Sequence, residues 1–327
     1  MWRSALLRYG LARLAGSALL LWVILTFTFV LIHATPGEPV WLYNNNLSPA
    51  GVERLRDLYG LTRPLPQQYL HWLGSVAQGD WGSSFASARP AMEVVLERVP
   101  ATLVLVGTVL LLEHAAGIGL GLWAAVRAGS RLDRGLRGIA LLANAVPVFV
   151  LGPLLIEIFA IRWPLLPPQQ MTSLGAEAWP WPSRLADLLF HLCLPALTYA
   201  CVRFGGVFRH VRNGLLDVLA SDHIRMARAF GIGEKRIFWR FALPHTFTPL
   251  IQRLGVALPM LLSSSMILEV IFSWPGLGWL FYNAVLQRDY PVLLATTAFT
   301  AVIVMLGNWA ADLAAASLDP RLRHAAT

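Results

Sequence analysis

The chain has 327 residues, of which 56% are hydrophobic and 13% are charged. Soluble proteins carry about 25% charged residues, so this composition excludes an ordinary soluble domain and indicates an integral membrane protein. The formal net charge of +8 would suggest nucleic acid as a partner of a soluble chain. In a membrane chain it indicates basic loops on the cytoplasmic side, and we expect no nucleic-acid partner.

Six apolar stretches are long enough to cross a bilayer as helices, which takes about 20 residues. The first ends in residues 33–36 (HATP), without a small-x-small cleavage site, so we expect a retained anchor rather than a signal peptide. Pro147 and Pro195 are expected to kink the third and fourth spans. The sequence predicts an all-α membrane protein with spans at residues 14–32, 101–126, 139–161, 188–206, 250–272 and 292–316.

The basic residues predict how these spans are oriented. With the N-terminus in the cytoplasm, sixteen Arg and Lys residues fall in cytoplasmic segments and eight in external ones. Membrane proteins keep their excess of basic residues inside, so both termini are predicted to be cytoplasmic. Residues 33–99 then form a long external loop, expected to fold into short helices and to be functional. We divide the chain into residues 1–98, the first span plus this loop, and residues 99–327, a five-span core.

Glu113, which is followed by His114, is the ionisable residue predicted near mid-membrane, where a charge is costly and marks a functional site. It either lines a pathway or accepts a buried hydrogen bond from a neighbouring helix or subunit. Arg203 is expected near an inner membrane end, where a long side chain can snorkel. Ser264 and Glu269 of the fifth span complete the candidate pathway residues.

The second span also contains residues 117–121 (GIGLG). Glycines four residues apart lie on one face of a helix, and small residues let membrane helices approach closely. The motif therefore predicts a close contact between the second span and a neighbouring helix.

Motifs of catalysis are missing from the sequence. It has neither G-x-x-x-x-G-K-[ST], which cradles nucleotide phosphates, nor H-E-x-x-H, which holds catalytic zinc. We therefore expect a chain that is not an enzyme and binds neither a catalytic metal nor a cofactor of its own.

Residues 222–244 (DHIRMARAFGIGEKRIFWRFALP) form a basic stretch between the fourth and fifth spans. Ser221 and Asp222 suit the start of a helix, and Gly231 suits its end. A second helix is expected from 234 to 241, before Leu243-Pro244. The short helix either floats on anionic lipid or docks into a groove of a cytoplasmic partner. An apolar stripe is predicted on it from Leu216, Leu219, Ala220, His223, Ala227 and Phe230.

The spacing A-x3-G-x9-apolar-x-L-P in this stretch resembles the cytoplasmic signature of binding-protein-dependent ABC importer permeases, in the form carried by the dipeptide/oligopeptide/nickel subfamily. It is met by Ala227, Gly231, Phe241, Leu243 and Pro244. Further motifs resemble the subfamily along nearly the whole chain, in the same order. They are residues 35–39 (TPGEP), 59–69 (YGLTRPLPQQY), 79–82 (GDWG), 98–102 (RVPAT), 269–278 (EVIFSWPGLG) and 319–321 (DPR).

The resemblance implies a type I importer fold and the role of the first of two homologous permease subunits in the bacterial inner membrane. Two ATPase subunits would bind ATP and Mg²⁺, and each permease subunit would insert a coupling helix into a groove of one ATPase. Here that contact is expected from residues 217–244. The implied coupling residues are Asp222, Arg225, Ala227, Arg228, Ala229, Gly231, Leu243 and Pro244. Arg225 replaces the signature's Glu, so the ATPase groove is expected to meet a basic helix.

The implied substrates are di- and oligopeptides, delivered by an external or periplasmic solute-binding protein. Nickel complexes and glutathione are alternatives within the subfamily. From a different class, a stand-alone channel or secondary transporter centred on Glu113 stays open. Four external-loop aromatic residues are candidates for contact with the binding protein, although anchoring at the membrane interface is the favoured alternative. They are Trp41, Tyr43, Trp72 and Trp81.

Overall fold

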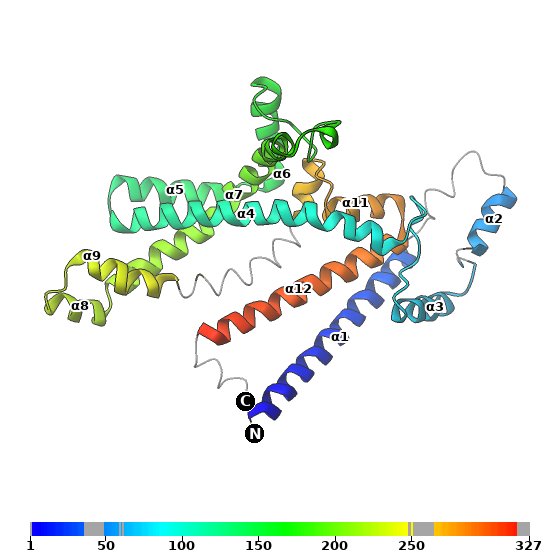
Figure 1. Cartoon of the computed structure of the whole chain (residues 1–327), viewed down its shortest axis with the longest axis horizontal. Helices are drawn as coiled ribbons and strands as arrows, with labels where there is room; N and C mark the ends of the chain where they lie inside the picture. Colours follow the sequence, from blue (N-terminus) through cyan, green and yellow to red (C-terminus); the bar gives the residue numbers. More distant parts are fainter. Residues whose placement is uncertain are drawn as a thin grey trace. The chain divides into compact units, whose positions relative to one another are not determined.

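The computed structural model describes residues 2–35, 49–58, 60, 62–247, 250 and 265–318, of which 2–14, 49, 55, 58 and 311–318 are described by backbone alone. The regular secondary structure of these residues is helical, apart from one isolated antiparallel bridge between Ser83 and Pro90 (Figure 1). Trp41, Tyr43, Ser264 and most of the predicted fifth span lie outside the described residues. The all-α prediction is confirmed for the described part of the chain.

The elements follow one another as helices of very different lengths. Long helices are α1 (Trp2–Ala34), α4 (Ala91–Val126), α7 (Trp181–Leu219) and α12 (Tyr290–Leu318). Shorter ones are α2 (Pro49–Leu58), α3 (Leu65–Ala77), α5 (Arg131–Ala145), α6 (Val148–Ile156), α8 (Asp222–Ala229), α9 (Glu234–Ile237) and α11 (Leu277–Gln287). Single turns of other types are the π-helices η2 (Glu157–Arg162) and η4 (Phe238–Ala242) and the 3-10 helix η3 (Ala176–Ala178).

Among the described residues, four helical segments are long and apolar enough to cross a membrane: Ala15–Ala34, Ala91–Val126, Trp181–Leu219 and Tyr290–Ala310. They contain most of the first, second, fourth and sixth predicted spans. The predicted third span is interrupted at Pro147, where α5 and the α6–η2 segment meet at a bend of 99°. Proline lacks the N–H that would continue the ladder, and Pro147 instead begins α6. Pro195, in contrast, lies inside the continuous helix α7.

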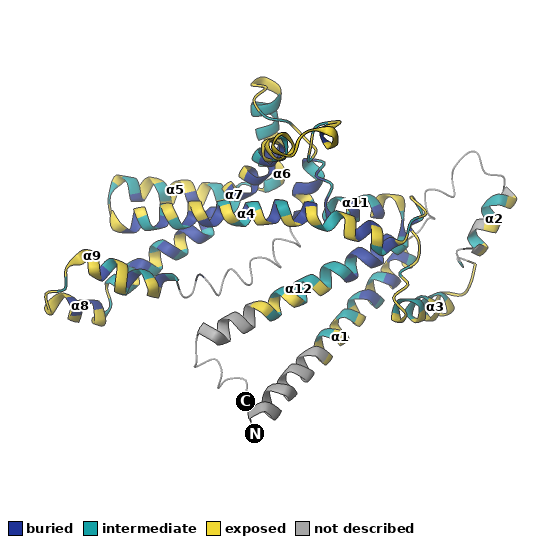
Figure 2. Cartoon of the chain, in the orientation of Figure 1, coloured by how far each residue is buried: buried dark blue, intermediate teal, exposed yellow. Residues whose placement is uncertain are grey.

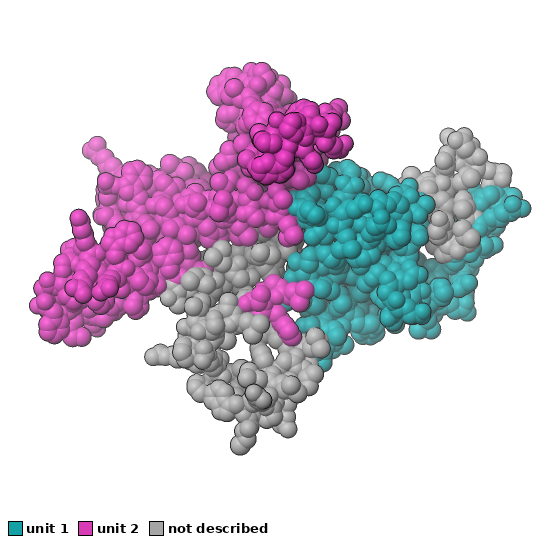
Figure 3. Space-filling model, viewed as in Figure 1, with its two compact units in different colours: residues 1–102, 275–305 teal, residues 103–274, 306–327 magenta. Residues whose placement is uncertain are grey.

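The chain divides into two compact units, residues 1–102 with 275–305 and residues 103–274 with 306–327 (Figure 3). In the first unit α1, α4, α11 and α12 share an apolar core. Asp289, which is 3% exposed, holds residues 84–86, which precede α4, against this core. Its carboxylate accepts a hydrogen bond of 2.6 Å from the Ser84 hydroxyl and bonds from the backbone N–H of Phe85 and Ala86.

The second unit is built on close contacts of α4 and α5 with α7, whose buried residues run from His191 to Leu215 (Figure 2). A Cβ added at Gly117 would lie 2.5 Å from the Cβ of Val207, and one at Gly121 would lie 3.0 Å from the carbonyl oxygen of Phe208. A Cβ at Gly205 would meet the carbonyl oxygen of Ala140 of α5 at 2.5 Å. The close packing predicted from GIGLG is thus confirmed, with α7 as the neighbouring helix.

Candidate functional site

The α8–η4 hairpin (residues 222–242) follows α7 directly, as in Figure 1. Ser221 takes the extended backbone of an N-cap residue, but its hydroxyl does not cap α8. It donates instead to the carbonyl of Val218 and lies 2.9 Å from Nδ1 of His223. The predicted helix start is therefore right, whereas the expected capping bond is absent because α7's last turn takes the hydroxyl.

Gly231 ends α8 in a left-handed conformation, with φ of +75°. Its N–H donates to the carbonyl of Arg228, and the N–H of Ile232 donates to the carbonyl of Ala227. These two bonds form a Schellman motif, which satisfies the free carbonyls at a helix end. Ile232 also packs against Ala227 and Ile224, the apolar contact that accompanies this motif. The predicted helix stop at Gly231 is confirmed.

The buried face of α8 differs from the predicted stripe. Ile224 is fully buried and Ala227 is 5% exposed, and both pack with Ile237 of α9. Phe230 is 80% exposed and His223 is also exposed. The stripe was right for Ala227 and wrong for His223 and Phe230, because it continued the helical period across Ala220 and Ser221, where α7 ends and the backbone turns. Residues Met226 and Phe230 are consequently the exposed large apolar side chains of this helix.

Ion pairs inside the hairpin neutralise its two α8 arginines. Arg225 pairs with Asp222 one turn earlier, and Arg228 pairs with Glu234 across the turn at 2.7 Å. The Arg228 guanidinium beside Glu234 lowers the pKa of that carboxyl. The first pair joins residues one helical turn apart, whereas the second depends on the turn at Gly231. The helix expected to be basic therefore presents arginines that are already paired.

The hairpin is fastened to the body of the second unit by apolar contacts. Ala242 of η4 packs with Leu215 of α7 and Ala125 of α4. Val218 of α7 packs against the Ile224–Ala227–Ile237 cluster. Residues 243–247, which include Leu243 and Pro244, continue as helix after η4, while Ala229 lies exposed near the end of α8. Displacing the hairpin would therefore move the ends of α4 and α7.

Glu113 forms an ion pair between α4 and α7. It is 2% exposed, and its carboxylate accepts a hydrogen bond of 2.9 Å from Nε of Arg203. Nδ1 of His114 lies 3.4 Å from its other oxygen. Arg203 was expected to snorkel alone, but the side chain turns toward Glu113 and Tyr199 instead. A single helix cannot reveal this pair, because its partners lie 90 residues apart.

The remaining candidate residues are placed as follows. Glu269 is fully buried and accepts a hydrogen bond of 3.2 Å from the Ser265 hydroxyl, one turn earlier. Trp72 and Trp81 are half-buried against the core of the first unit, and the ring of Trp72 stacks on Phe29 at 5.4 Å. Each of these side chains thus has a packing or hydrogen-bonding role in the structure.

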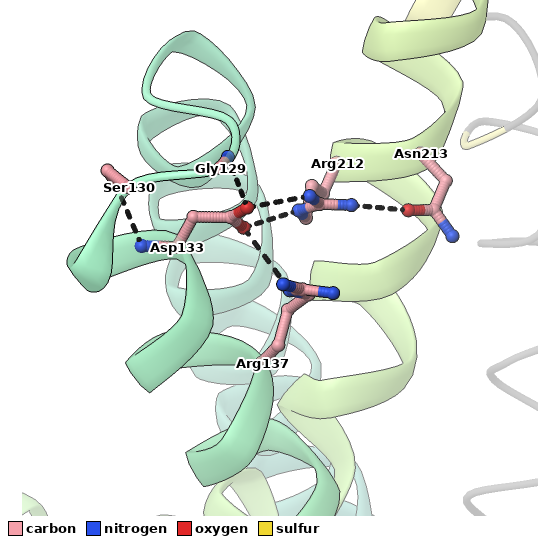
Figure 4. A network of polar contacts seen from close by, with 6 residues as sticks. All are labelled: Gly129, Ser130, Asp133, Arg137, Arg212 and Asn213. Carbon is pink, nitrogen blue, oxygen red and sulfur yellow. Dashed lines mark hydrogen bonds and ion pairs between the residues drawn. The ribbon is translucent and has the colours of Figure 1, made fainter.

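Sequence reasoning missed a buried carboxylate, Asp133, in the first turn of α5. Ser130 is the N-cap of α5 and accepts the N–H of Asp133, while the Asp133 carboxylate accepts the N–H of Gly129. This reciprocal arrangement is related to the capping box, and the signal S-x-x-D before an apolar run was present in the sequence. Figure 4 shows Arg212 of α7 reaching the same carboxylate.

Two family models match the chain. One, described as "Binding-protein-dependent transport system inner membrane component", matches residues 117–324. The other, described as "Binding-prot-dependent transport system membrane comp, N-term", matches residues 6–106. Between them they span most of the sequence, including the α8–η4 hairpin.

Curated relatives are similar over nearly the whole chain. The oligopeptide transport system permease protein AppB of Bacillus subtilis is 35% identical, over 97% of this chain and 99% of its own length. The dipeptide permease DppB of Escherichia coli K12 is 32% identical, over 91% and 93%. The glutathione permease GsiC of Escherichia coli O1:K1 is also 32% identical, over 98% and 100%.

Among solved structures, an inward-facing conformation of the MetNI methionine ABC transporter has a similar fold. The TM-score is 0.53 at 18% sequence identity, over 70% of this chain and 97% of that chain. Given the family match, the relatives that are similar over nearly their full length and this fold, the chain belongs to the binding-protein-dependent transport system inner membrane components.

Proposed function

We propose that this chain is the permease subunit of an ATP-driven ABC importer for short peptides. The observation that carries the proposal is the α8–η4 hairpin, closed by the Schellman motif at Gly231 and packed onto the ends of α4 and α7. A hairpin fixed in this way is suited to receive a mechanical input from a partner. The names of AppB and DppB support a peptide as the transported solute.

The proposed partners supply what the chain does not contain. Two ATPase subunits bind ATP and Mg²⁺ and hydrolyse the nucleotide. A second homologous permease subunit completes the translocation path, and an external or periplasmic solute-binding protein delivers the peptide. The family description and the bacterial relatives support this assembly and a place in the inner membrane, surrounded by lipid.

The proposed topology has six spans, with both termini and the coupling hairpin in the cytoplasm. Support comes from the four long apolar helices, from the bent α5–α6 pair and from the apolar stretch at residues 250–272. The fold is of type I, with residues 1–98 as the first span and external loop and residues 99–327 as the core. Trp41, Tyr43, Trp72 and Trp81 remain candidate contacts of the binding protein, and Glu113, Ser264 and Glu269 remain candidates for the path.

In the proposed mechanism, closure of the ATPase pair displaces the α8–η4 hairpin. The exposed side chains Met226 and Phe230 enter the ATPase groove, with Asp222, Arg225 and Arg228 around them. The spans then change between inward- and outward-open arrangements as rigid bodies, one of the known forms of switching. The chain itself performs no chemical step in this mechanism, because the energy comes from hydrolysis in the partner.

Replacing Gly231 tests the coupling role. Gly231→Val forces a β-branched residue into the left-handed region, which costs an L-residue about 1–2 kcal/mol, and should distort the hairpin. We expect ATP-driven peptide uptake by proteoliposomes containing all subunits to fall several-fold. Gly233→Val is the matched control, because Gly233 has φ of −65° and open space around its Cβ position. Equal uptake by both variants would contradict the role of the hairpin.

Glutathione is a second candidate solute, favoured by the similarity to GsiC. Ligand binding to the solute-binding protein encoded beside this chain distinguishes it from peptides and from nickel complexes. A stand-alone transporter centred on Glu113 predicts uptake by the purified chain in liposomes without ATP or partners. The pairing of Glu113 with Arg203 makes that alternative less favourable, since the carboxylate is already engaged.

A further inference from the structure

Four nitrogen atoms, from two arginines and one backbone N–H group, lie around the carboxylate of Asp133, which is fully buried. Arg212 of α7 donates through Nε at 2.6 Å and through Nη2 at 2.8 Å. Gly129 donates its backbone N–H at 2.9 Å, and Nε of Arg137 lies 3.6 Å away. In Figure 4 the Arg212 and Arg137 side chains reach the carboxylate from two different helices. A fork of two parallel bonds fixes direction as well as distance.

The location of Arg212 connects this carboxylate to the hairpin. Arg212 lies seven residues before Leu219, the end of α7, which is about 10 Å along a helix. Between the two, Leu215 packs with Ala125 of α4 and Ala242 of η4. A displacement of the α8–η4 hairpin therefore acts on the segment of α7 that carries Arg212.

The pair is costly to bury, which argues against a merely incidental contact. Asp133 has no exposed surface and the Arg212 side chain is 13% exposed, so both groups lose hydration on folding. Replacing such a pair by apolar residues is often neutral or stabilising, so its presence is weak support for a role in stability. With apolar contacts alone, α5 could slide along α7, whereas the two hydrogen bonds between Arg212 and Asp133 hold the two helices in one register.

A second contact makes the connection rigid. Gly205 of α7 lies so close to α5 that an added Cβ would stand 2.5 Å from the carbonyl oxygen of Ala140. Together with the Arg212–Asp133 fork, this contact holds α5 against α7 at two levels along its length. Two fixed points along a helix resist tilting, and one alone does not.

We propose that the Asp133–Arg212 pair is a positioning joint, which makes the α4–α5 turn (residues 127–130) and α5 move together with the end of α7 when the hairpin is displaced. The joint thereby passes motion from the hairpin to the broken span formed by α5 and α6. This inference rests on the proposed function of an ATP-driven permease. In this proposal Asp133 and Arg212 act by holding α5 and α7 together, and neither residue contacts the substrate.

The test compares transport with ATP hydrolysis in the assembled transporter in proteoliposomes. Arg212→Gln and Asp133→Asn should each raise the ATP hydrolysed per peptide imported about 10-fold, with unchanged amounts of ATPase subunit bound. Asparagine still accepts the Gly129 N–H, so the local turn is kept. The double variant should hydrolyse no more ATP per imported peptide than the more strongly affected single variant, because both substitutions remove the same interaction.

Two variants separate the joint from a general effect of charge. Arg212→Lys keeps the charge without the fork and should recover part of the coupling. Arg209→Gln removes an exposed arginine one turn earlier on α7 and should leave the ratio unchanged. If Arg212→Gln hydrolyses as much ATP per imported peptide as the unaltered transporter, the proposed joint is overturned. An unaltered transporter without ATP-driven uptake overturns the proposed function and the joint with it.

A distance measurement decides the matter even if the variants fail to assemble. Spin labels are placed at Gly135→Cys of α5, where an added Cβ has open space, and at the exposed Asp217→Cys of α7, with Cys193 and Cys201 changed to serine. We expect the same label distance in the nucleotide-free and ATP-bound transporter. A distance that changes between the two states overturns the joint.

Discussion

Glu113 and Arg203 illustrate how one residue's role depends on a partner far away in the sequence. Glu113 is buried and Arg203 largely so, and each charge alone would be costly there, whereas together they share a hydrogen bond of 2.9 Å. Neutralising one of them leaves the other without its counter-charge. The same reasoning does not hold for Glu157 and Arg162, whose side chains are 45% and 71% exposed.

Glu113→Gln is accordingly expected to destabilise the chain strongly. Breaking a buried ion pair costs about 3–5 kcal/mol, and the partial exposure of Arg203, 23%, places this variant at the lower end of that range. Glu157→Gln is the control and should cost about 0–1 kcal/mol. Thermal unfolding in detergent measures both, and Glu113→Gln/Arg203→Gln should be less destabilised than Glu113→Gln alone. Equal decreases in melting temperature for Glu113→Gln and Glu157→Gln would disprove the role of the buried pair.

Glu234 gives a second prediction for a single residue, on pH. Arg228 lowers the pKa of this carboxyl below its ordinary value of 4.5, so in the window just below 4.5 the folded hairpin binds fewer protons than the unfolded one. The stabilisation of the hairpin by the Arg228–Glu234 pair is present above pH 4.5 and is lost as the pH falls through the lowered pKa of Glu234. Carboxyl NMR titration of the labelled chain should give a midpoint below 4.5, restored toward 4.5 by Arg228→Gln. A midpoint at or above 4.5 would count against the pair.

Among the helices, close approach is decided by glycine positions that differ in their surroundings. Gly117 and Gly121 face α7, while an added Cβ at Gly119 would meet nothing within 4 Å. All three lie in one motif, and helix geometry puts the first and last on the same face. The motif thus predicts that a face exists, and the structure identifies the helix that it meets.

Gly117→Ala should therefore destabilise the α4–α7 contact. The new Cβ would lie 2.5 Å from Cβ of Val207, and overpacking of this kind costs about 1–3 kcal/mol. Gly119→Ala is the matched control and should be neutral or stabilising by up to ~1 kcal/mol, since alanine favours the helix. Adding Val207→Ala to Gly117→Ala should restore part of the loss in thermal stability. The contact would be disproved if the two single alanine variants behaved alike.

For the whole molecule, the predicted topology can be tested by labelling single cysteines with an impermeant reagent. Arg131 and Lys235 are exposed residues predicted inside, and Arg63 and Glu177 are exposed residues predicted outside. With Cys193 and Cys201 replaced, Arg131→Cys and Lys235→Cys should react in inverted vesicles, and Arg63→Cys and Glu177→Cys in intact spheroplasts. Arg131 and Glu177 flank the α5–α6 pair, so reaction of both from one side would make that pair a re-entrant loop and contradict six spans.

Much of the fold follows from the sequence because its signals are local. A run of about 20 apolar residues predicts a spanning helix without knowledge of its neighbours. Gly231 predicts a helix end because a left-handed residue is needed there. The predicted stripe on α8 failed at His223 and Phe230 for a physical reason, since the helical period stops where the backbone turns at Ala220 and Ser221.

By itself, then, the sequence determined the helices, their apolar character, the hairpin and the family resemblance, all of which depend on residues close together in the chain. Tertiary structure alone decided the partners of two buried carboxylates, Arg203 for Glu113 and Arg212 for Asp133, and of the exposed Glu234, which pairs with Arg228. It also decided that Gly117 meets α7 and that the kink predicted at Pro147 is as large as 99°. Such contacts depend on how helices are placed in space, and no local pattern encodes that placement.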